Sequence, residues 1–184
     1  MSIATEVTSD RLIAALSAVD GKAEVVGGRV LPMSPTGTRP NRAGGAIYIS
    51  LRAFEKRAGG WAYSDNLAYV VDLPNRKSFS PDASFVVGPI PSMKFAQGPP
   101  AFAAEVRSEG DYGPAAEHEM AAKRADYFAA GTKVVWDVDL LSDEVVRVYR
   151  ADAPEHPTVY RRGETAEAEP AVPGWKFAVN ELFD

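Results

Sequence analysis

The sequence contains no cysteine and only two histidines, and these absences exclude several kinds of site. Without thiols the chain can form neither disulfides nor thiolate metal sites, which fits a reducing compartment. His118 and His156 are too few and too far apart in the sequence to form a zinc site without cysteines. A zinc centre is therefore not expected.

Long apolar runs and the common nucleotide-binding and nucleophile motifs are missing as well. No apolar run approaches the roughly 18 to 20 residues that span a bilayer. Residues 1–6 lack the basic and apolar regions of a secretory signal. The absence of a Walker or Rossmann glycine loop and of a nucleophile elbow argues against NTPases, dehydrogenases and serine hydrolases. We expect a cytoplasmic protein with no membrane partner.

An excess of positive charge is also absent, since the formal charge is -5. Phosphate contacts need clustered Lys and Arg, so this charge counts against strong non-specific binding to nucleic acid. Residues 1–110 nevertheless carry 12 Lys and Arg against 10 Asp and Glu, whereas residues 111–184 carry 8 against 15. A polyanion is therefore expected to meet the N-terminal half. The candidate basic residues there are Arg39, Arg42, Arg52, Lys56, Arg57, Arg76 and Lys77.

What is present has the composition of one globular domain, which we expect to cover residues 1–184. The hydrophobic fraction is 46% and the charged fraction 24%, as in ordinary globular proteins. Residues 8–19, 46–58 and 114–130 have helical patterns with recognisable ends. Residues 34–45 contain so many prolines and glycines that an irregular loop is expected, and residues 88–100 are predicted to form a second long loop.

Segments of β-forming residues alternate with these helices and predict an α/β fold. The pair Gly27-Gly28 between residues 24–26 and 29–31 is typical of a tight β-hairpin. Residues 101–106 are nearly all small and apolar, which is typical of a strand in the middle of a mixed sheet covered by helices. The other expected strands are residues 61–64, 68–72 (joined to the first by a turn at 65–66), 84–87, 133–139, 144–150 and 158–161, with a last apolar segment at 175–183.

Two acidic residues and a lysine stand in an order that suits metal-dependent nucleases. Asp82 follows Pro81 and leads into a β-forming run, Glu105 lies late in the next strand, and Lys123 is in the middle of the following helix. Two carboxylates bind a hard divalent cation, and an ammonium group helps to position or activate a water molecule. An unpaired carboxylate in so apolar a strand is unfavourable, so a cation or metal is expected beside Glu105.

Longer motifs surround these residues and extend over nearly the whole chain. They are Pro81-Asp82, Glu105-Val106-x-Ser108, Lys123-x3-Tyr127, Ala130-Gly131-x-Lys133-Val134-Val135-Trp136-x-Val138-Asp139, Arg147-Val148-Tyr149, Pro173-Gly174 and Leu182-Phe183. In these motifs the chain resembles the Uma2 family of putative restriction endonucleases, within the PD-(D/E)XK nuclease superfamily. The resemblance implies a restriction-endonuclease-like fold, in which a mixed β-sheet is flanked by helices.

The resemblance also implies roles for individual residues. Asp82 and Glu105 would hold Mg²⁺, or Mn²⁺, with the backbone carbonyl of Val106 as the third ligand. The superfamily's usual lysine follows the glutamate by two residues, where this chain has Arg107, which keeps its proton and is a poor activator of water. Lys123 on the next helix is expected to take that role. Its neighbour Tyr127 is expected to be a packing residue with its hydroxyl near the site.

Each candidate residue also has a structural interpretation. Glu24 matches the family's N-terminal acidic position, which often approaches the metal, but it could be a surface carboxylate beside a turn. Lys123 could pair with Glu119, which lies four residues earlier in the favourable order for an exposed helical ion pair. Asp82 could cap a turn, and Glu105 could be a paired core carboxylate.

Two functions from different classes follow. The first is a Mg²⁺-dependent endonuclease that hydrolyses phosphodiester bonds in nucleic acid, with DNA as the expected substrate and Lys123 assisting the attack of water. The alternative is a non-catalytic module that kept the fold and binds DNA or a protein partner. The acidic charge, Arg107, and Pro40 in place of the family's usual histidine favour the alternative. The superfamily's habit of presenting two sites to a duplex makes a homodimer plausible.

Overall fold

The computed structural model describes residues 9–88 and 92–184. Its helices are α1 (Ser9–Ser17), α2 (Thr38–Ala58), α3 (Pro114–Ala130) and the 3-10 helix η1 (Val179–Leu182). Its strands are β1 (Ala23–Val26), β2 (Arg29–Pro32), β3 (Trp61–Ser64), β4 (Tyr69–Val70), β5 (Ser78–Phe79), β6 (Ala83–Val86), β7 (Ala96–Gln97), β8 (Phe102–Val106), β9 (Val134–Val138), β10 (Val146–Arg150), β11 (Ala153–Tyr160), β12 (Thr165–Glu167) and β13 (Lys176–Ala178).

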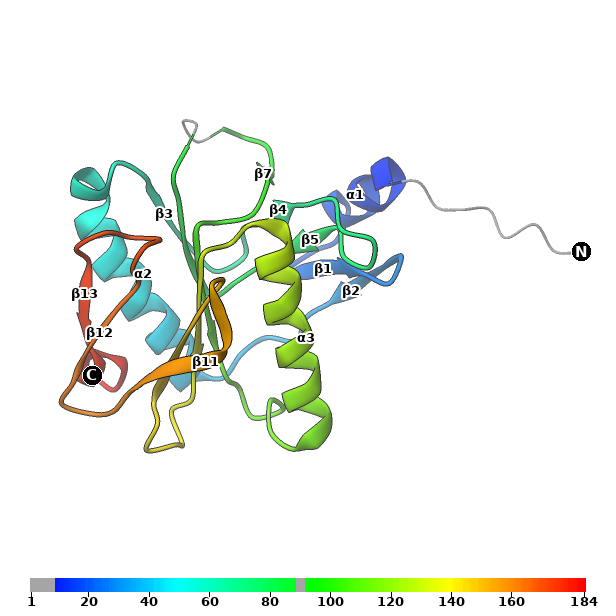
Figure 1. Cartoon of the computed structure of the whole chain (residues 1–184). Helices are drawn as coiled ribbons and strands as arrows, with labels where there is room; N and C mark the ends of the chain where they lie inside the picture. Colours follow the sequence, from blue (N-terminus) through cyan, green and yellow to red (C-terminus); the bar gives the residue numbers. More distant parts are fainter. Residues whose placement is uncertain (1–8, 89–91) are drawn as a thin grey trace, which may run out of the picture.

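A mixed six-stranded sheet forms the centre of the fold, in the order β11-β10-β9-β8-β6-β3. Strands β8 and β9 are parallel, and the other neighbouring pairs of this sheet are antiparallel. Helix α2 packs on one face of the sheet and α3 on the other (Figure 1). This arrangement confirms the expected mixed α/β fold with a sheet flanked by helices.

Strand β8 lies between β6 and β9, in the middle of the sheet, as its apolar sequence predicted. Phe102 and Ala104 belong to the core that α2 covers, whereas Ala103 packs with Tyr127 of α3. Because side chains alternate along a strand, Glu105 faces the same side as Ala103. The sheet therefore directs the carboxylate of this strand toward helix α3.

Several predicted elements are present with small changes at their ends. Helix α1 confirms the first predicted helix, whose first residue, Thr8, lies outside the described residues. Helix α3 begins at Pro114 and ends before Gly131, whose φ of 113° is typical of a helix C-terminus. In the β1–β2 hairpin Gly27 and Gly28 have φ values of 57° and 71°, the positive values that a tight turn requires. The hairpin of β9 and β10 is confirmed as well.

Helix α2 begins earlier than the sequence predicted, so the expected loop over residues 34–45 is wrong from residue 38 onward. Pro40 lies in the first turn, where a missing N–H costs no helical hydrogen bond. Gly44 is buried against Asp82, and a Cβ at this glycine would lie 3.4 Å from Asp82 Cβ. Tertiary packing therefore stabilises a helical segment whose own helix propensity is poor.

The strand predicted over residues 68–72 is shorter than expected and lies in a different sheet from β3. Strand β4 pairs with β5 and β7, whereas β3 pairs with β6. Strand β5 falls in a segment where no strand was predicted, and β7 falls in the 88–100 loop, of which residues 89–91 lie outside the described residues. Two-residue strands carry no alternating pattern, so only their long-range pairing reveals them. Strand β11 is also longer than the predicted 158–161.

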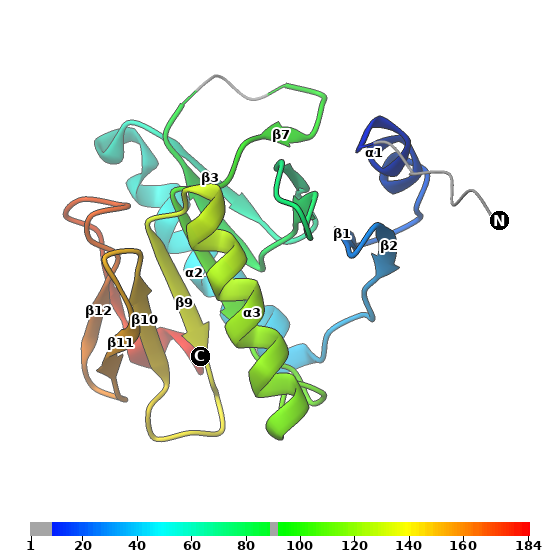
Figure 2. The ribbon, with the colours of Figure 1, turned by 45° about the vertical axis from the view of Figure 1, so that its right-hand side comes forward.

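The N-terminal hairpin lies on the α3 side of the molecule (Figure 2). Strand β1 contacts β5: Val25 N donates to Ser78 Oγ at 2.8 Å, and Lys77 N donates to Val25 O at 2.8 Å. Val25 is buried in a cluster with Leu12 and Leu16 of α1. These contacts bring the residues on either side of Val25 close to the central sheet. Across residues 9–88 and 92–184, no helix is long and apolar enough to cross a membrane.

Candidate active site

Asp82 and Glu105 lie at the same end of two neighbouring strands, as predicted. Asp82 directly precedes β6, and its backbone N donates to Ala104 O of β8 at 3.1 Å. Its side-chain Oδ2 accepts a hydrogen bond from Val106 N at 2.8 Å. The antiparallel pairing of β6 with β8 therefore positions the Asp82 carboxylate beside the end of the strand that carries Glu105.

Lys123 of helix α3 contacts two carboxylates from distant parts of the chain. Its Nζ lies 2.9 Å from Glu105 Oε1 and 2.9 Å from Glu24 Oε1. The ion pair with Glu119 that helical spacing allowed is absent from the salt bridges of the described residues. The face of α3 that carries Lys123 therefore looks toward the sheet and the hairpin.

Glu24 is a buried residue of β1, only 5% exposed, so its interpretation as a surface carboxylate is wrong. Its Oε1 also accepts a hydrogen bond from Ser80 N at 2.9 Å, and its Oε2 lies 2.6 Å from Arg76 Nη1. Arg76 binds Asp126 through Nε at 2.8 Å and is 7% exposed. Arg76 is therefore an internal partner of Glu24, which corrects its assignment to a basic surface.

The charges of this cluster determine its protonation. Burial opposes the charge of Lys123, but the carboxylates of Glu105 and Glu24 outweigh it and raise the pKa of Lys123. Burial also raises the pKa of Glu105; Lys123 opposes this change, and the charges of Asp82 and Glu24 add to it. For Glu24 the two cations Lys123 and Arg76 outweigh burial and lower the pKa. Lys123 is therefore a protonated hydrogen-bond donor at neutral pH.

Tyr127 completes the surroundings of Glu105, as the sequence predicted for its hydroxyl. The Tyr127 hydroxyl donates to Glu105 Oε1 at 2.6 Å, and its ring stacks on Phe79 with centroids 4.0 Å apart. Burial, followed by the charge of Glu105, raises the pKa of Tyr127 well above its usual value. Glu105 Oε1 thus receives two donors, while Oε2 accepts no hydrogen bond from the described residues.

Sequence reasoning missed Lys22 and Asp65, which surround the Asp82 carboxylate. Lys22 Nζ lies 2.8 Å from Asp82 Oδ1 and 2.6 Å from Asp65 Oδ1. Burial opposes the charge of Lys22, but Asp82 and Glu105, with hydrogen bonds to Asp65 and Asp82, raise its pKa. Neither residue belongs to a motif, and only the fold brings them together. The one local signal is that Lys22 lies two residues before Glu24.

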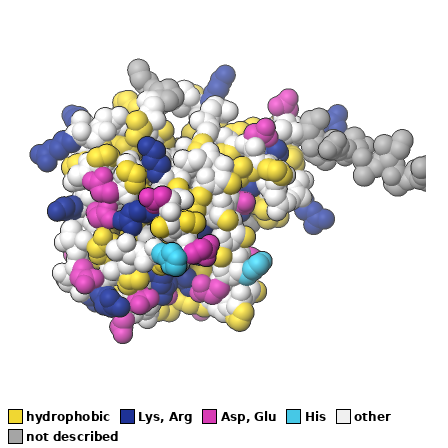
Figure 3. Space-filling model, viewed as in Figure 1, with side chains coloured by type: hydrophobic (Ala, Val, Ile, Leu, Met, Phe, Trp, Pro, Cys, Tyr) yellow, Lys and Arg dark blue, Asp and Glu magenta, His cyan; other side chains and the backbone are white. Residues whose placement is uncertain are grey.

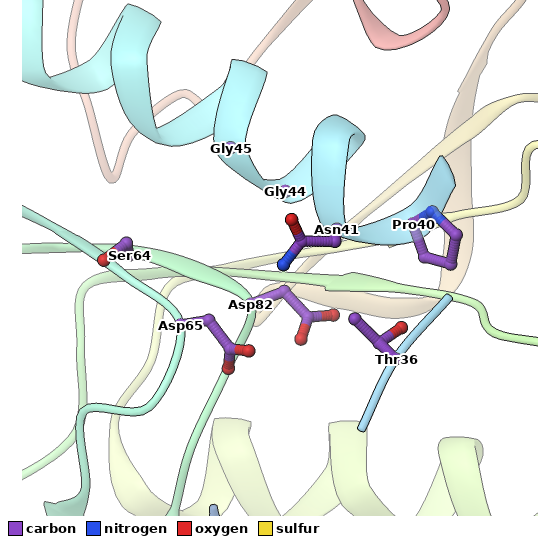
Figure 4. A pocket seen from close by; sticks show the side chains of 8 residues that line it. All are labelled: Thr36, Pro40, Asn41, Gly44, Gly45, Ser64, Asp65 and Asp82. Atoms are coloured by element: carbon purple, nitrogen blue, oxygen red, sulfur yellow. The ribbon is translucent and has the colours of Figure 1, made fainter. Parts of the chain in front are cut away.

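A cavity of about 220 Å³ lies beside these carboxylates. Figure 4 shows Asp65 and Asp82 side by side, with Asn41 of α2 above Asp82. Its lining residues are Thr36, Pro40, Asn41, Gly44, Gly45, Ser64, Asp65 and Asp82.

Arg107 is directed into a separate ion-pair network. Its guanidinium binds both oxygens of Asp137, with Nε to Oδ1 and Nη2 to Oδ2 each at 2.7 Å, and also contacts Glu117. Arg107 and Asp137 are both nearly inaccessible to solvent. Arg107 is therefore engaged in holding β9 and α3 to the end of β8.

The oxygen atoms at the site suit a hard divalent cation. Asp82 and Glu105 are carboxylates on neighbouring strands, Glu105 keeps one oxygen without a donor, and a backbone carbonyl follows at Val106. Within the part of the chain that the structure describes, however, no group of three or more acidic, His or Cys side chains is arranged to hold a metal ion. The ammonium groups of Lys22 and Lys123 lie between the carboxylates instead.

Comparison with known proteins agrees with this architecture. The profile of the Uma2 family, described as putative restriction endonucleases, matches residues 11–180. No protein with a curated description matches the chain. The crystal structure of a putative nuclease belonging to DUF820 from Anabaena variabilis superimposes with a TM-score of 0.71 at 14% sequence identity, covering 94% of this chain and 97% of that one. At this identity the likeness shows a shared fold, and the family profile extends over most of the sequence. The chain belongs to the Uma2 family of putative restriction endonucleases.

Proposed function

We propose that this protein is a Mg²⁺-dependent endonuclease that hydrolyses phosphodiester bonds in DNA. One observation carries the proposal: the ammonium of Lys123 is held between Glu24 and Glu105, and Asp82 lies on the neighbouring strand. Three carboxylates and a protonated lysine from four separate segments meet at one end of a sheet. Removing so many charges from water opposes folding. Ionisable groups with perturbed pKa values concentrate at functional sites, so this cluster is the candidate for one.

Asp82, Glu105 and the carbonyl of Val106 are the groups that would hold Mg²⁺. When bound, this ion neutralises charge on the phosphate and lowers the pKa of a bound water molecule. Tyr127 orients Glu105 by donating to Oε1, which leaves Oε2 for the cation. Mn²⁺ has similar ligand preferences and is expected to substitute.

Lys123 remains protonated, so it does not remove a proton from water. It donates hydrogen bonds and carries positive charge, and in this way it positions the attacking water and stabilises the charge that develops on the phosphate. Glu24 fixes the Lys123 ammonium at 2.9 Å and is itself held by Arg76. Glu24 is thus a positioning residue for Lys123.

A plasmid-cleavage assay tests the proposal. Wild-type protein with Mg²⁺ is expected to nick or linearise supercoiled DNA, and chelation of the metal should stop the reaction. Asp82→Ala, Glu105→Gln and Lys123→Met should each lower the rate by at least about 100-fold. Glu119→Gln is the matched control, because it removes a carboxylate from the same helix without touching the cluster. Cleavage that persists in Asp82→Ala would contradict the assigned site.

Calorimetric titration of Mg²⁺ or Mn²⁺ tests the metal separately from the reaction. Saturable binding to the wild type and its loss in Asp82→Ala and Glu105→Ala are expected. If metal binding is absent both with and without a short DNA duplex, the endonuclease proposal fails. The second candidate, a non-catalytic module that binds DNA or a protein, would then be preferred. It is favoured by the ammonium of Lys22, which occupies Asp82 Oδ1.

The homodimer suggested by the superfamily stays a prediction. Two active sites facing a duplex would let one assembly cut both strands. Light scattering of the purified protein, alone and with duplex DNA, measures the mass directly. A mass twice that of the 19.8 kDa chain is the expected result, and a monomer in both conditions would contradict it.

A further inference from the structure

Both oxygens of the Asp82 carboxylate already have partners within the protein. Oδ2 accepts the hydrogen bond of Val106 N at 2.8 Å, and Oδ1 lies 2.8 Å from Lys22 Nζ. The side chains of Lys22 and Asp82 are 15% and 21% exposed, so the pair is largely shielded from solvent. A cation that binds Asp82 must therefore either share an oxygen with one of these two donors or displace it.

Of the two donors, Lys22 is the one that can move. Val106 N belongs to the backbone of β8, which is held on both sides by β6 and β9. Lys22 lies outside any helix or strand, just before β1, and its ammonium is attached through four rotatable methylene groups. Moving this ammonium breaks no sheet hydrogen bond.

Lys22 also has a second carboxylate partner, Asp65, which lies beside Asp82. Its Nζ lies 2.6 Å from Asp65 Oδ1, and the Asp65 side chain is 38% exposed. Asp65 and Asp82 both line the 220 Å³ cavity, to which Thr36, Asn41 and Ser64 contribute further oxygen atoms (Figure 4). Lys and Arg are absent from the lining, and the Lys22 ammonium contacts both of its carboxylates.

We propose that Lys22 is an internal counter-cation of the metal site: its ammonium neutralises Asp82 in the metal-free protein and withdraws to Asp65 when a divalent cation binds. This inference rests on the proposed function, because it assigns Asp82 to the metal. The ammonium reduces repulsion between Asp82 and the nearby Glu105 while the metal is absent. It also competes with the metal, so metal affinity is weaker than the carboxylates alone would give.

Mn²⁺ binding, measured by electron paramagnetic resonance of the free ion and by calorimetry, tests this role without any reaction. Lys22→Met removes the competing charge and is expected to tighten Mn²⁺ binding by about tenfold. Lys22→Gln should act in the same direction and serves if the methionine variant folds poorly. Lys77→Met is the matched control, because it removes an ammonium that binds the exposed Asp72 at 2.6 Å, and it should leave the affinity unchanged.

The possible results separate this inference from the proposed function. Equal Mn²⁺ affinity in the wild type and both Lys22 variants, with loss of binding in Asp82→Ala, would overturn the role of Lys22 and leave the metal site intact. No Mn²⁺ binding in any of the proteins would overturn both. Weaker binding in the Lys22 variants would also overturn the inference, since it would mean that Lys22 supports the metal site.

Discussion

The different roles of the basic residues Arg107 and Lys123 follow from the carboxylates that surround each of them. Arg107 holds Asp137 through two parallel hydrogen bonds, which is the geometry a planar guanidinium favours. Lys123 is a single point charge between Glu24 and Glu105. Its one nitrogen atom, Nζ, lies 2.9 Å from an oxygen of each carboxylate. Lys123 of helix α3, and not Arg107 at the end of β8, therefore lies within the carboxylate cluster.

Replacing Lys123 should affect stability as well as activity. Lys123→Met leaves the partly buried Glu105 beside Asp82 and Glu24 without its cation, so we expect the free energy of unfolding to fall by about 3 kcal/mol. Glu119→Gln on the same helix should change it by less than about 0.5 kcal/mol. Urea denaturation followed by circular dichroism measures both values. Equal effects of the two substitutions would mean that Lys123 is not paired in solution.

Tyr69 should make stability depend on pH in the alkaline range. Its buried hydroxyl lies 2.7 Å from Ser84 Oγ, and burial raises the pKa of Tyr69 well above its usual value. Tyrosine in the unfolded chain ionises near pH 10, so above that pH the unfolded state loses a proton that the folded state retains. The stability present below about pH 10 is therefore lost as the pH rises, by at most about 1.4 kcal/mol per pH unit from this group.

The matching measurement is urea denaturation of the wild type and Tyr69→Phe at about pH 8 and about pH 11. The variant should lose less stability than the wild type between the two conditions, because it has no hydroxyl to ionise at this position. Other buried tyrosines, such as Tyr127, contribute in the same direction and remain in both proteins. An equal loss in the two proteins would count against a raised pKa of Tyr69.

At the scale of elements, helix α2 forms because its packing on the sheet outweighs the low helix propensity of its first half. Its first half contains Pro40, Gly44 and Gly45, yet it packs across β3, β6 and β8 through buried Ile47 and Leu51. The two helical glycines differ in their surroundings: a Cβ at Gly44 would contact Asp82, whereas a Cβ at Gly45 would have no heavy atom within 4 Å. Of these two glycines, only Gly44 packs closely against the candidate site.

Two glycine substitutions, one in α2 and one after it, should change the stability of the protein in opposite directions. Gly45→Ala adds a methyl group in open space and improves helix propensity, so stability should rise by about 0.8 kcal/mol. At Gly60, which follows the helix, a Cβ would lie 2.4 Å from the backbone oxygen of Val86, so Gly60→Ala should cost about 2 kcal/mol. Thermal or urea denaturation of both variants measures the difference. Stabilisation by Gly60→Ala would contradict the contact between the α2–β3 connection and β6.

The molecule has an acidic net charge, and charges of both signs are mixed on the face that Figure 3 shows. On the face shown in Figure 3, Lys and Arg side chains are interspersed with Asp and Glu. Four of the seven N-terminal basic candidates have partners within the protein: Arg42 binds the backbone oxygen of Asp184, Arg52 pairs with Glu55, Arg76 with Glu24 and Lys77 with Asp72. Such a surface offers few free phosphate contacts, so the proposed DNA binding is expected to depend on the proposed cation at the carboxylate cluster.

Affinity for duplex DNA should therefore depend on a divalent ion. Ca²⁺ is a hard cation that carboxylate oxygens also bind, so fluorescence anisotropy in Ca²⁺ should give at least about tenfold tighter binding than in chelator at matched ionic strength. Asp82→Ala should lose this difference, because it lacks a carboxylate of the proposed metal site. Tight binding in the presence of chelator would indicate a different DNA surface and support the non-catalytic module.

The sequence by itself determined the local parts of this protein. The helix over residues 114–130, the Gly27-Gly28 hairpin and the buried character of β8 follow from periodicity, turn residues and composition, all of which act over a few neighbouring residues. The same local patterns marked Asp82 and Glu105 as carboxylates at strand ends. These features could be predicted because each depends only on residues that are close together in the sequence.

Only the tertiary structure decided which of these parts meet. The pairing of Lys123 with Glu24, rather than with Glu119, required β1 to reach the α3 side of the sheet. The start of α2 and the meeting of Lys22 with Asp65 and Asp82 likewise depend on contacts between residues far apart in the chain. Such contacts leave no periodic signal in the sequence, because burial and charge compensation are properties of the assembled fold.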